Sequence, residues 1–202
     1  MNKLKIGNGI GVSRSCIILL FLIMALTPSA TAADTMFRAD LQHTGVFDNG
    51  GIVPTNNELW RFMTRGTVSS SPAVSNGIIY VGSDDNNLYA IDAITGKEKW
   101  RFATGDDVYS SPAVANGVVY VGSGGVNLYA IDAVTGKEKW RFMAGGAVSS
   151  SPAVSNGVIY VGSSVKNLYA IDAVTGAEKW RFATGGAMYS SCLLYTSDAA
   201  DE

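Results

Sequence analysis

The sequence contains very little cysteine, histidine or net charge. Its two cysteines are Cys16 and Cys192, and its one histidine is His43. Both cysteines lie in end segments that we expect to be outside the fold, so disulfide bonds are not expected to stabilise the folded part. The chain has 15 basic and 17 acidic residues, a formal net charge of −2. Such a balance provides no strong positive field to attract nucleic acid or an anionic membrane.

Long apolar runs are also scarce. The run from Cys16 to Leu26 has 11 residues and follows a basic leader with Lys3, Lys5 and Arg14, whereas a membrane-spanning helix needs about 20 apolar residues. Small residues at Ala30-Thr31-Ala32 then provide a cleavage site. This order is typical of a secretory signal peptide. We therefore expect a signal peptide over 1–32 and export of the mature chain, with a membrane anchor as the alternative.

A repeat fills most of the remaining sequence. Four tryptophans lie 40 residues apart, each followed by Arg-Phe: Trp60, Trp100, Trp140 and Trp180. Between them lie three near-copies of one sequence, over residues 68–102, 108–142 and 148–182, and a fourth copy starts at 188–191. A period in the forties built of short β segments is typical of propeller blades. We predict an all-β fold, a partial β-propeller with three complete four-stranded antiparallel blades in an open arc.

Each copy is expected to contain four short strands. In the first copy these are Ser70–Val74, Ile78–Gly82, Leu88–Asp92 and Glu98–Phe102. Asn76-Gly77 indicates a tight hairpin, because both turn positions need positive φ. In the last turn, an aspartate side chain is expected to accept backbone N–H bonds, and a glycine is expected to adopt positive φ. These turn residues recur in every copy: Asp92, Asp132 and Asp172 with Gly96, Gly136 and Gly176.

The tryptophans are expected to hold neighbouring blades together. A blade cannot bury its faces alone and gains stability by stacking on its neighbours. A large aromatic side chain at one fixed place in each blade suits that contact, so we expect Trp100, Trp140 and Trp180 to pack in the core and not to bind a cofactor. Trp60 lies in an outer-strand sequence, residues 59–62, that no inner strands precede. We expect it to be a closing strand that completes the last blade of a propeller.

Two further segments flank the repeat region, one before it and one after it. Residues 33–58 are expected to form an N-terminal segment that leads into the repeats at 59–191. After Ser191 the repeat stops in mid-strand, and residues 192–202 resemble the translation of a sequencing adapter. We expect this tail not to be native, with a genuine divergent terminus as the alternative.

The third-to-fourth-strand segment resembles a known family. The pattern Ala90-x-Asp92-x-x-Thr95-Gly96-Lys97-Glu98-x-Trp100 is similar to the tryptophan-docking motif of quinoprotein, or PQQ-like, β-propeller repeats. It recurs over 130–140, and over 170–180 with alanine in place of lysine. The segment 36–45 is similar to the start of many secreted members. The resemblance covers about residues 36–191 and implies the propeller fold, but one fold hosts many functions.

The resemblance implies three classes of relative: quinone-dependent dehydrogenases, a periplasmic propeller lipoprotein of outer-membrane protein assembly, and cell-surface or sensor propellers. A dehydrogenase would use PQQ, calcium, a catalytic aspartate and often a vicinal disulfide, yet the sequence has no adjacent cysteines. Asp84 to Asn87 offers oxygen ligands of the kind that calcium prefers, but the equivalent turns do not. No serine or cysteine partner for His43 is placed by a motif. We therefore predict no catalytic, cofactor-binding or metal-binding residues and no enzyme activity, with PQQ and calcium expected only if the parent is a dehydrogenase.

Differences between the copies concentrate in two loops. These are the connections between blades, such as residues 104–107, and the second-to-third-strand turns, such as 84–87. Successive turns of an up-and-down blade alternate between faces, so both variable loops should emerge on one face, where binding residues tend to sit. The predicted recognition face contains Arg65, Asp84, Asp85, Asp106, Asp107, Tyr109 and Lys166. Neutral drift in exposed turns is the alternative.

The function predicted from these observations is that of a binding scaffold. We expect an exported or cell-surface propeller that binds a protein or a surface glycan, with no nucleic-acid partner and no membrane span in the mature chain. A dehydrogenase fragment, a fragment of the assembly lipoprotein and the sensor half of a receptor remain the alternatives. The oligomeric state stays open, and an open arc would leave two blade faces uncovered.

Overall fold

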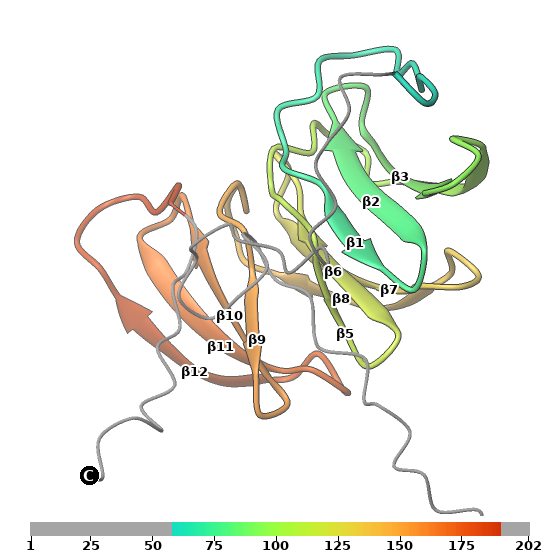
Figure 1. Ribbon diagram of the computed structural model, residues 1–202. Helices are drawn as coiled ribbons and strands as arrows, with labels where there is room; N and C mark the ends of the chain where they lie inside the picture. The colour runs from blue at the N-terminus through green and yellow to red at the C-terminus, as the bar shows by residue number, and fades with distance from the viewer. Residues whose placement is uncertain (1–57, 191–202) are drawn as a thin grey trace, which may run out of the picture. The chain divides into compact units, whose positions relative to one another are not determined.

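The computed structural model describes residues 58–190, which form twelve β-strands and no helix (Figure 1). It follows that no helix within this range is long and apolar enough to cross a membrane. The predicted signal peptide, His43, both cysteines and the 192–202 tail lie outside the described residues.

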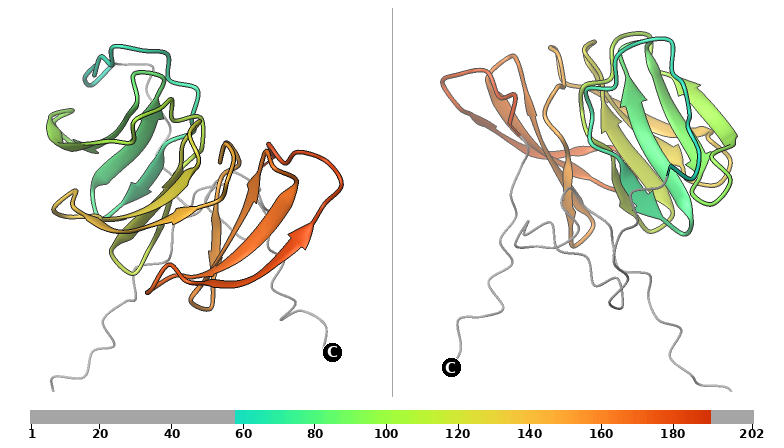
Figure 2. Two further views of the ribbon diagram at one scale, coloured as in Figure 1. Left: turned by 180° about the vertical axis from the view of Figure 1, so that it is seen from behind. Right: turned by 45° about the horizontal axis from the view of Figure 1, so that its top comes forward.

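The strands form three four-stranded antiparallel sheets, each in sequence order. Blade 1 contains β1 (Ala73–Ser75), β2 (Ile78–Ser83), β3 (Asn87–Asp92) and β4 (Glu98–Ala103). Blade 2 contains β5 (Ala113–Ala115), β6 (Val118–Gly122), β7 (Asn127–Asp132) and β8 (Glu138–Met143). Blade 3 contains β9 (Ala153–Ser155), β10 (Val158–Ser163), β11 (Asn167–Asp172) and β12 (Glu178–Ala183). Figure 2 shows the same order of strands from two further sides. The predicted all-β fold of four-stranded antiparallel blades is confirmed.

The first strand of each blade starts later than predicted. In blade 1 it begins at Ala73 and not at Ser70, and Pro72 lies between them without a backbone N–H to donate. The Ser70 hydroxyl takes over the pairing, since its Oγ donates to the carbonyl of Gly82 at 3.0 Å and accepts from the Gly82 N–H at 2.7 Å. A side chain thus holds the inner edge to β2 where backbone pairing stops.

The turns have the predicted local chemistry. Asn76 and Gly77 both have positive φ, 50° and 72°, as a two-residue hairpin requires. Asp92 Oδ1 accepts hydrogen bonds from the backbone N–H groups of Ile94 and Thr95 at 3.2 and 2.9 Å. Because of these bonds to Thr95, together with that of Lys99, the pKa of Asp92 is lowered to about 2. The same bonds recur at Asp132 and Asp172.

Buried side chains of adjacent blades form shared cores. One cluster joins Tyr80 and Leu88 of blade 1 to Val119 and Ile131 of blade 2, and a second cluster joins blades 2 and 3 in the same way. The inner strands also contact one another, β1 with β5 and β5 with β9. Each blade therefore packs on the next, which is the arrangement of a propeller.

The tryptophans of blades 1 and 2 each dock on the last turn of the next blade. Trp100 Nε1 donates to the carbonyl oxygen of Ala133 at 3.0 Å, and Trp140 Nε1 donates to that of Ala173 at 3.2 Å. The glycine of the same turn lies under the indole, since a Cβ at Gly136 would stand 2.7 Å from Trp100. Glycine is therefore needed there for close approach as well as for its positive φ of 69°.

Trp180 and Trp60 differ from the other two tryptophans. Trp180 is 47% exposed, contrary to the expected core packing, because no further blade lies on it within residues 58–190. Trp60 docks on blade 1, with Nε1 donating to the carbonyl of Ala93 at 3.0 Å. The structure assigns no strand to residues 58–62, so their role as a closing strand stays a prediction.

The exposed and docked tryptophans provide a matched pair for a stability test. We expect Trp140→Ala to lower the free energy of unfolding by about 3 kcal/mol, as for other large-to-alanine changes at a packed contact. Trp180→Ala should lower it by about 1 kcal/mol or less, a typical value for a point mutation. Urea unfolding followed by circular dichroism measures both, and equal losses would contradict the docking role of Trp140.

Candidate recognition face

The two kinds of variable loop are hydrogen-bonded to each other in every blade. The first N–H of each second-to-third-strand turn donates to the connection before it: Asp84 to Thr67 O, Gly124 to Asp107 O and Ser164 to Ala147 O, at 2.9, 2.7 and 2.9 Å. Each turn also accepts from the connection after it, as Asn86 O does from the Thr104 N–H at 3.0 Å. These bonds place both loop sets on one face of the blades, with their backbones fixed by one another.

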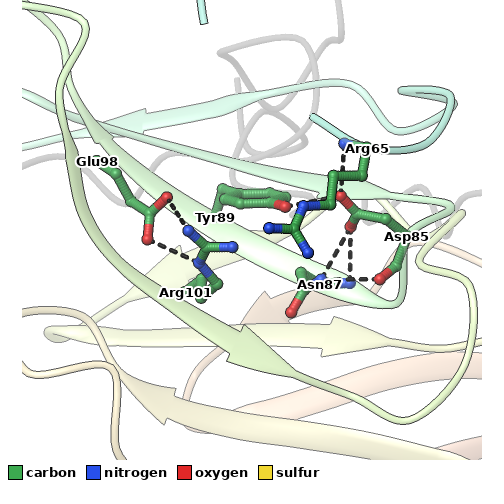
Figure 3. Close-up of polar contacts among 6 residues, drawn as sticks. All are labelled: Arg65, Asp85, Asn87, Tyr89, Glu98 and Arg101. Atoms are coloured by element: carbon green, nitrogen blue, oxygen red, sulfur yellow. Dashed lines mark hydrogen bonds and ion pairs between the residues drawn. The ribbon is translucent and has the colours of Figure 1, made fainter. Parts of the chain in front are cut away.

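Asp85 is the centre of one polar network on this face (Figure 3). Its Oδ2 accepts from the Arg65 backbone N–H at 2.9 Å and from the Tyr89 hydroxyl at 2.7 Å, and its Oδ1 accepts from the Asn87 N–H at 3.2 Å. Burial acts to raise the pKa of Asp85, but these hydrogen bonds and that of Ser83 outweigh it, so the pKa is lowered. The network fixes the turn to the preceding connection.

Asp106, Asp107 and Tyr109 form a second group, beside Asp84. The Tyr109 hydroxyl donates to Asp107 Oδ2 at 2.5 Å. This hydrogen bond, partial burial, and the negative charges of Asp107, Asp84 and Asp106 raise the pKa of Tyr109 to about 12. Asp84 Oδ2 accepts from the Ser69 hydroxyl at 3.3 Å, while its Oδ1 is buried and has no partner within the described residues. Asp107 thus contacts a tyrosine that is 42% exposed, while Asp84 and Asp106 act on it through their charges.

The two predicted cations are placed differently. The Arg65 backbone N–H donates to Asp85 Oδ2, and the Arg65 side chain is exposed. Lys166 lies in the corresponding turn of blade 3, exposed and with a positive φ of 66°. Within residues 58–190 no hydrogen bond or ion pair joins its side chain to the other six residues. Blades 1 and 2 therefore carry the acidic part of the face.

Asn87 and Tyr89 also belong to this site, although neither is among the seven predicted recognition residues. The equivalent tyrosines of blades 2 and 3 donate to the carbonyls of Thr104 and Ala144 in the preceding connections. Tyr89 donates to Asp85 instead. Comparison of the three copies could have identified this difference, because Asp85 occupies the position that Gly125 and Val165 have in the other two turns.

Metal-ligating side chains are not clustered in the part of the chain that the structure describes. Within 58–190 no group of three or more His, Cys, Asp or Glu is arranged to hold a metal ion. The carboxylates of Asp85 and Asp107 already accept hydrogen bonds from Tyr89 and Tyr109.

A cavity of about 280 Å³ lies elsewhere, between blades 2 and 3. It is lined by the docking residues Tyr120, Trp140 and Ala173 among others, and by none of the seven predicted recognition residues. The loop face is therefore distinct from this cavity.

The fold and its docking tryptophans define the class of protein, a partial β-propeller of PQQ-like repeats. Residues 48–146 and 107–199 match the model of the family described as outer membrane protein assembly factor BamB. The chain belongs to this family of PQQ-like repeat proteins. No curated protein matches the sequence.

Solved structures similar to this chain include enzymes and an assembly factor. A quinohemoprotein alcohol dehydrogenase from Comamonas testosteroni is 30% identical over 58% of this chain and 21% of its own, with a TM-score of 0.53. BamB from Moraxella catarrhalis is 18% identical over 61% of this chain and 39% of its own, with a TM-score of 0.55. A europium-containing methanol dehydrogenase is 23% identical over 73% and 31%, with a TM-score of 0.64. The chain thus spans well under half the length of each protein, and the latter two show the fold alone.

The acidic group can be tested by tyrosine titration. The pKa of Tyr109 lies at about 12 because its hydroxyl bonds to Asp107, so Asp107→Ala should lower it towards the ordinary value of about 10. Tyr80, whose pKa is also raised to about 12 but first by burial, is the internal control and should not move. The raised pKa of Tyr109 contributes to the free energy of unfolding below pH 10, and this contribution is lost as the pH rises to 12. The free energy of unfolding of Asp107→Ala should therefore fall less between pH 10 and 12 than that of the wild type. Ultraviolet difference titration with Tyr109→Phe as reference measures the shift, and an unchanged Tyr109 would contradict the assigned contact.

Proposed function

We propose that this chain is a non-catalytic, exported binding scaffold, and that its acidic loop face binds a cationic segment of a partner protein. The observation that supports this proposal is the hydrogen bond of the 42% exposed Tyr109 to Asp107, which directly follows the exposed Asp106. The exposed Asp106 and the tyrosine ring offer a lysine or arginine both a carboxylate and an aromatic surface.

The rigid backbone of the loops also favours binding. The backbone groups of Thr104 and Asp107 are both hydrogen-bonded to neighbouring turns. The backbone that carries the side chains of Asp106, Asp107 and Tyr109 is therefore held in place. A preorganised surface loses less conformational entropy when a partner binds. A surface glycan could meet the same aspartates and tyrosine, and the charge of the probe separates these two kinds of partner.

A peptide probe tests the charge preference. We expect a lysine-rich peptide to shift the backbone amide resonances of residues 104–109 in NMR titration, and a glutamate-rich peptide of equal length to leave them unchanged. Asp106→Ala with Asp107→Ala should weaken binding about tenfold or more, since each charge-assisted hydrogen bond contributes about 1.5–3 kcal/mol. Ser164→Ala with Val165→Ala, in the second-to-third-strand turn of blade 3 on the same face, is the control. Equal binding by both double variants would overturn the proposal.

A dehydrogenase fragment is the second candidate, supported by the 30% identity to a quinohemoprotein alcohol dehydrogenase. We favour the scaffold because the described residues lack a metal-binding group. Addition of PQQ and calcium to the chain should leave its tryptophan fluorescence and its melting temperature unchanged. A saturable change in either would favour the dehydrogenase.

A further inference from the structure

The cavity of about 280 Å³ between blades 2 and 3 takes no part in the proposed loop face. Its eight lining residues come from β6, β8 and the first turn of blade 2, and from the first and last turns of blade 3. These turns lie at the opposite end of the strands from the variable loops. Both neighbouring blades are four-stranded sheets of the described chain, so the cavity belongs to a fully formed interface.

The aromatic walls of the cavity present carbon atoms to an occupant. Trp140 Nε1 and the Tyr120 hydroxyl both donate to the carbonyl oxygen of Ala173, at 3.2 and 3.1 Å. The centroids of the two rings are 5.9 Å apart, and Val118 and Val174 add aliphatic surface. An apolar cavity of about 150 Å³ is large enough to hold benzene. The larger cavity here therefore has room for an aromatic ring with a short substituent.

Two polar side chains are available at the edge of the cavity. Lys139 and Asn116 are both exposed, and Lys139 is the only charged residue of the lining. The Lys139 ammonium lies 3.6 Å from Asp132 Oδ2, whereas the equivalent pairs of blades 1 and 3 are 3.3 and 3.1 Å apart. Exposed ion pairs of this kind are weak. Lys139 can therefore pair with a ligand carboxylate in place of Asp132.

The interface between blades 1 and 2 provides an internal comparison. Seven of the eight lining residues have an identical counterpart 40 positions earlier in the sequence. The eighth differs, because Val118 takes the place of Ile78. Each of these two side chains packs against the apolar cluster that joins its own blade to the next. Since packed interiors respond to a single methylene, the smaller Val118 leaves space in the second interface that Ile78 fills in the first.

We propose that this cavity binds a small organic acid whose aromatic body lies between Tyr120, Trp140 and Val118 and whose carboxylate pairs with Lys139 and Asn116. Apolar walls with a few convergent polar groups are the usual composition of a small-molecule site. The Lys139 stem can lie along the apolar wall while its ammonium stays at the solvent edge. This site is separate from the proposed binding of a cationic segment, because none of the seven recognition residues lines it.

Hydrocinnamate, an aromatic ring with a short carboxylate chain, is the probe. In NMR titration we expect saturable shifts of the Trp140 indole N–H and the Gly157 amide resonances. Hydrocinnamamide has the same ring without the charge and should bind about threefold to fivefold more weakly, the effect of one exposed ion pair. Absence of a saturable shift at Trp140, or equal affinity for the acid and the amide, would overturn the proposal.

The difference between Ile78 and Val118 supplies a matched pair of variants. Val118→Ile inserts the residue that blade 1 carries at this position and should weaken hydrocinnamate binding about tenfold or more, as one methylene does in an apolar pocket. Ile78→Val is the reciprocal change and should make the Trp100 indole N–H resonance respond to the same probe. Unchanged binding by a folded Val118→Ile would overturn the proposal.

The two equivalent lysines test the charged end of the site without altering the core. Lys139→Gln should weaken hydrocinnamate binding about threefold to fivefold and leave hydrocinnamamide binding unchanged. Lys99→Gln, which removes the corresponding lysine of blade 1, should affect neither ligand. If circular dichroism shows that Val118→Ile is unfolded, this pair decides, and an equal effect of Lys139→Gln and Lys99→Gln would overturn the proposal.

The acidic loop face and the cavity can be tested independently of each other. Asp106→Ala with Asp107→Ala should leave hydrocinnamate binding unchanged, because neither residue lines the cavity. Val118→Ile should likewise leave the response of residues 104–109 to a lysine-rich peptide unchanged. Failure of the proposed function would thus appear with the peptide alone, and failure of the present proposal with hydrocinnamate alone.

Discussion

The docking of one indole on the last turn of the next blade is the contact on which this structure depends. A single blade has two apolar faces and cannot bury them alone. Trp100 and Trp140 connect the blades by combining a large apolar contact with a hydrogen bond to a turn carbonyl. That contact requires glycine at 136 and 176, where a Cβ would come within 2.7 Å of the indole. The invariance of the turns among the copies follows from this geometry.

Docking of this kind leaves the opposite loops free to vary. The loop backbones are held by hydrogen bonds between neighbouring turns and connections, as from Gly124 N–H to Asp107 O. Because these bonds use main-chain groups, the side chains can change from blade to blade without loss of the frame. Blade 1 illustrates the freedom that results, since Asp85 redirects the Tyr89 hydroxyl from a carbonyl to a carboxylate. Variation and structural constancy therefore occupy separate parts of each blade.

The similar proteins of known structure are consistent with a constant blade framework that carries variable loops. Alcohol and methanol dehydrogenases and an outer-membrane assembly factor share the blade, yet the chain spans only 21–39% of their lengths. The blade fold by itself therefore does not determine one kind of function. Function has to be argued from the loop face, and there the described residues present carboxylates and an exposed tyrosine.

The 40-residue period, the Asn-Gly and Thr-Gly turns and the recurring tryptophans determined by themselves that the chain forms four-stranded blades, because these are local signals repeated in every copy. The sequence also indicated which loops vary. Only the tertiary structure decided where β1 starts, since Ser70 replaces backbone pairing with a side-chain bond to Gly82. It alone showed that the Tyr109 hydroxyl bonds to Asp107, and that identical tryptophans differ, with Trp100 docked and Trp180 exposed. The physical reason is that the burial of a side chain and the charges near it depend on the adjacent blade. The sequence of one repeat does not specify which residues of the adjacent blade it contacts.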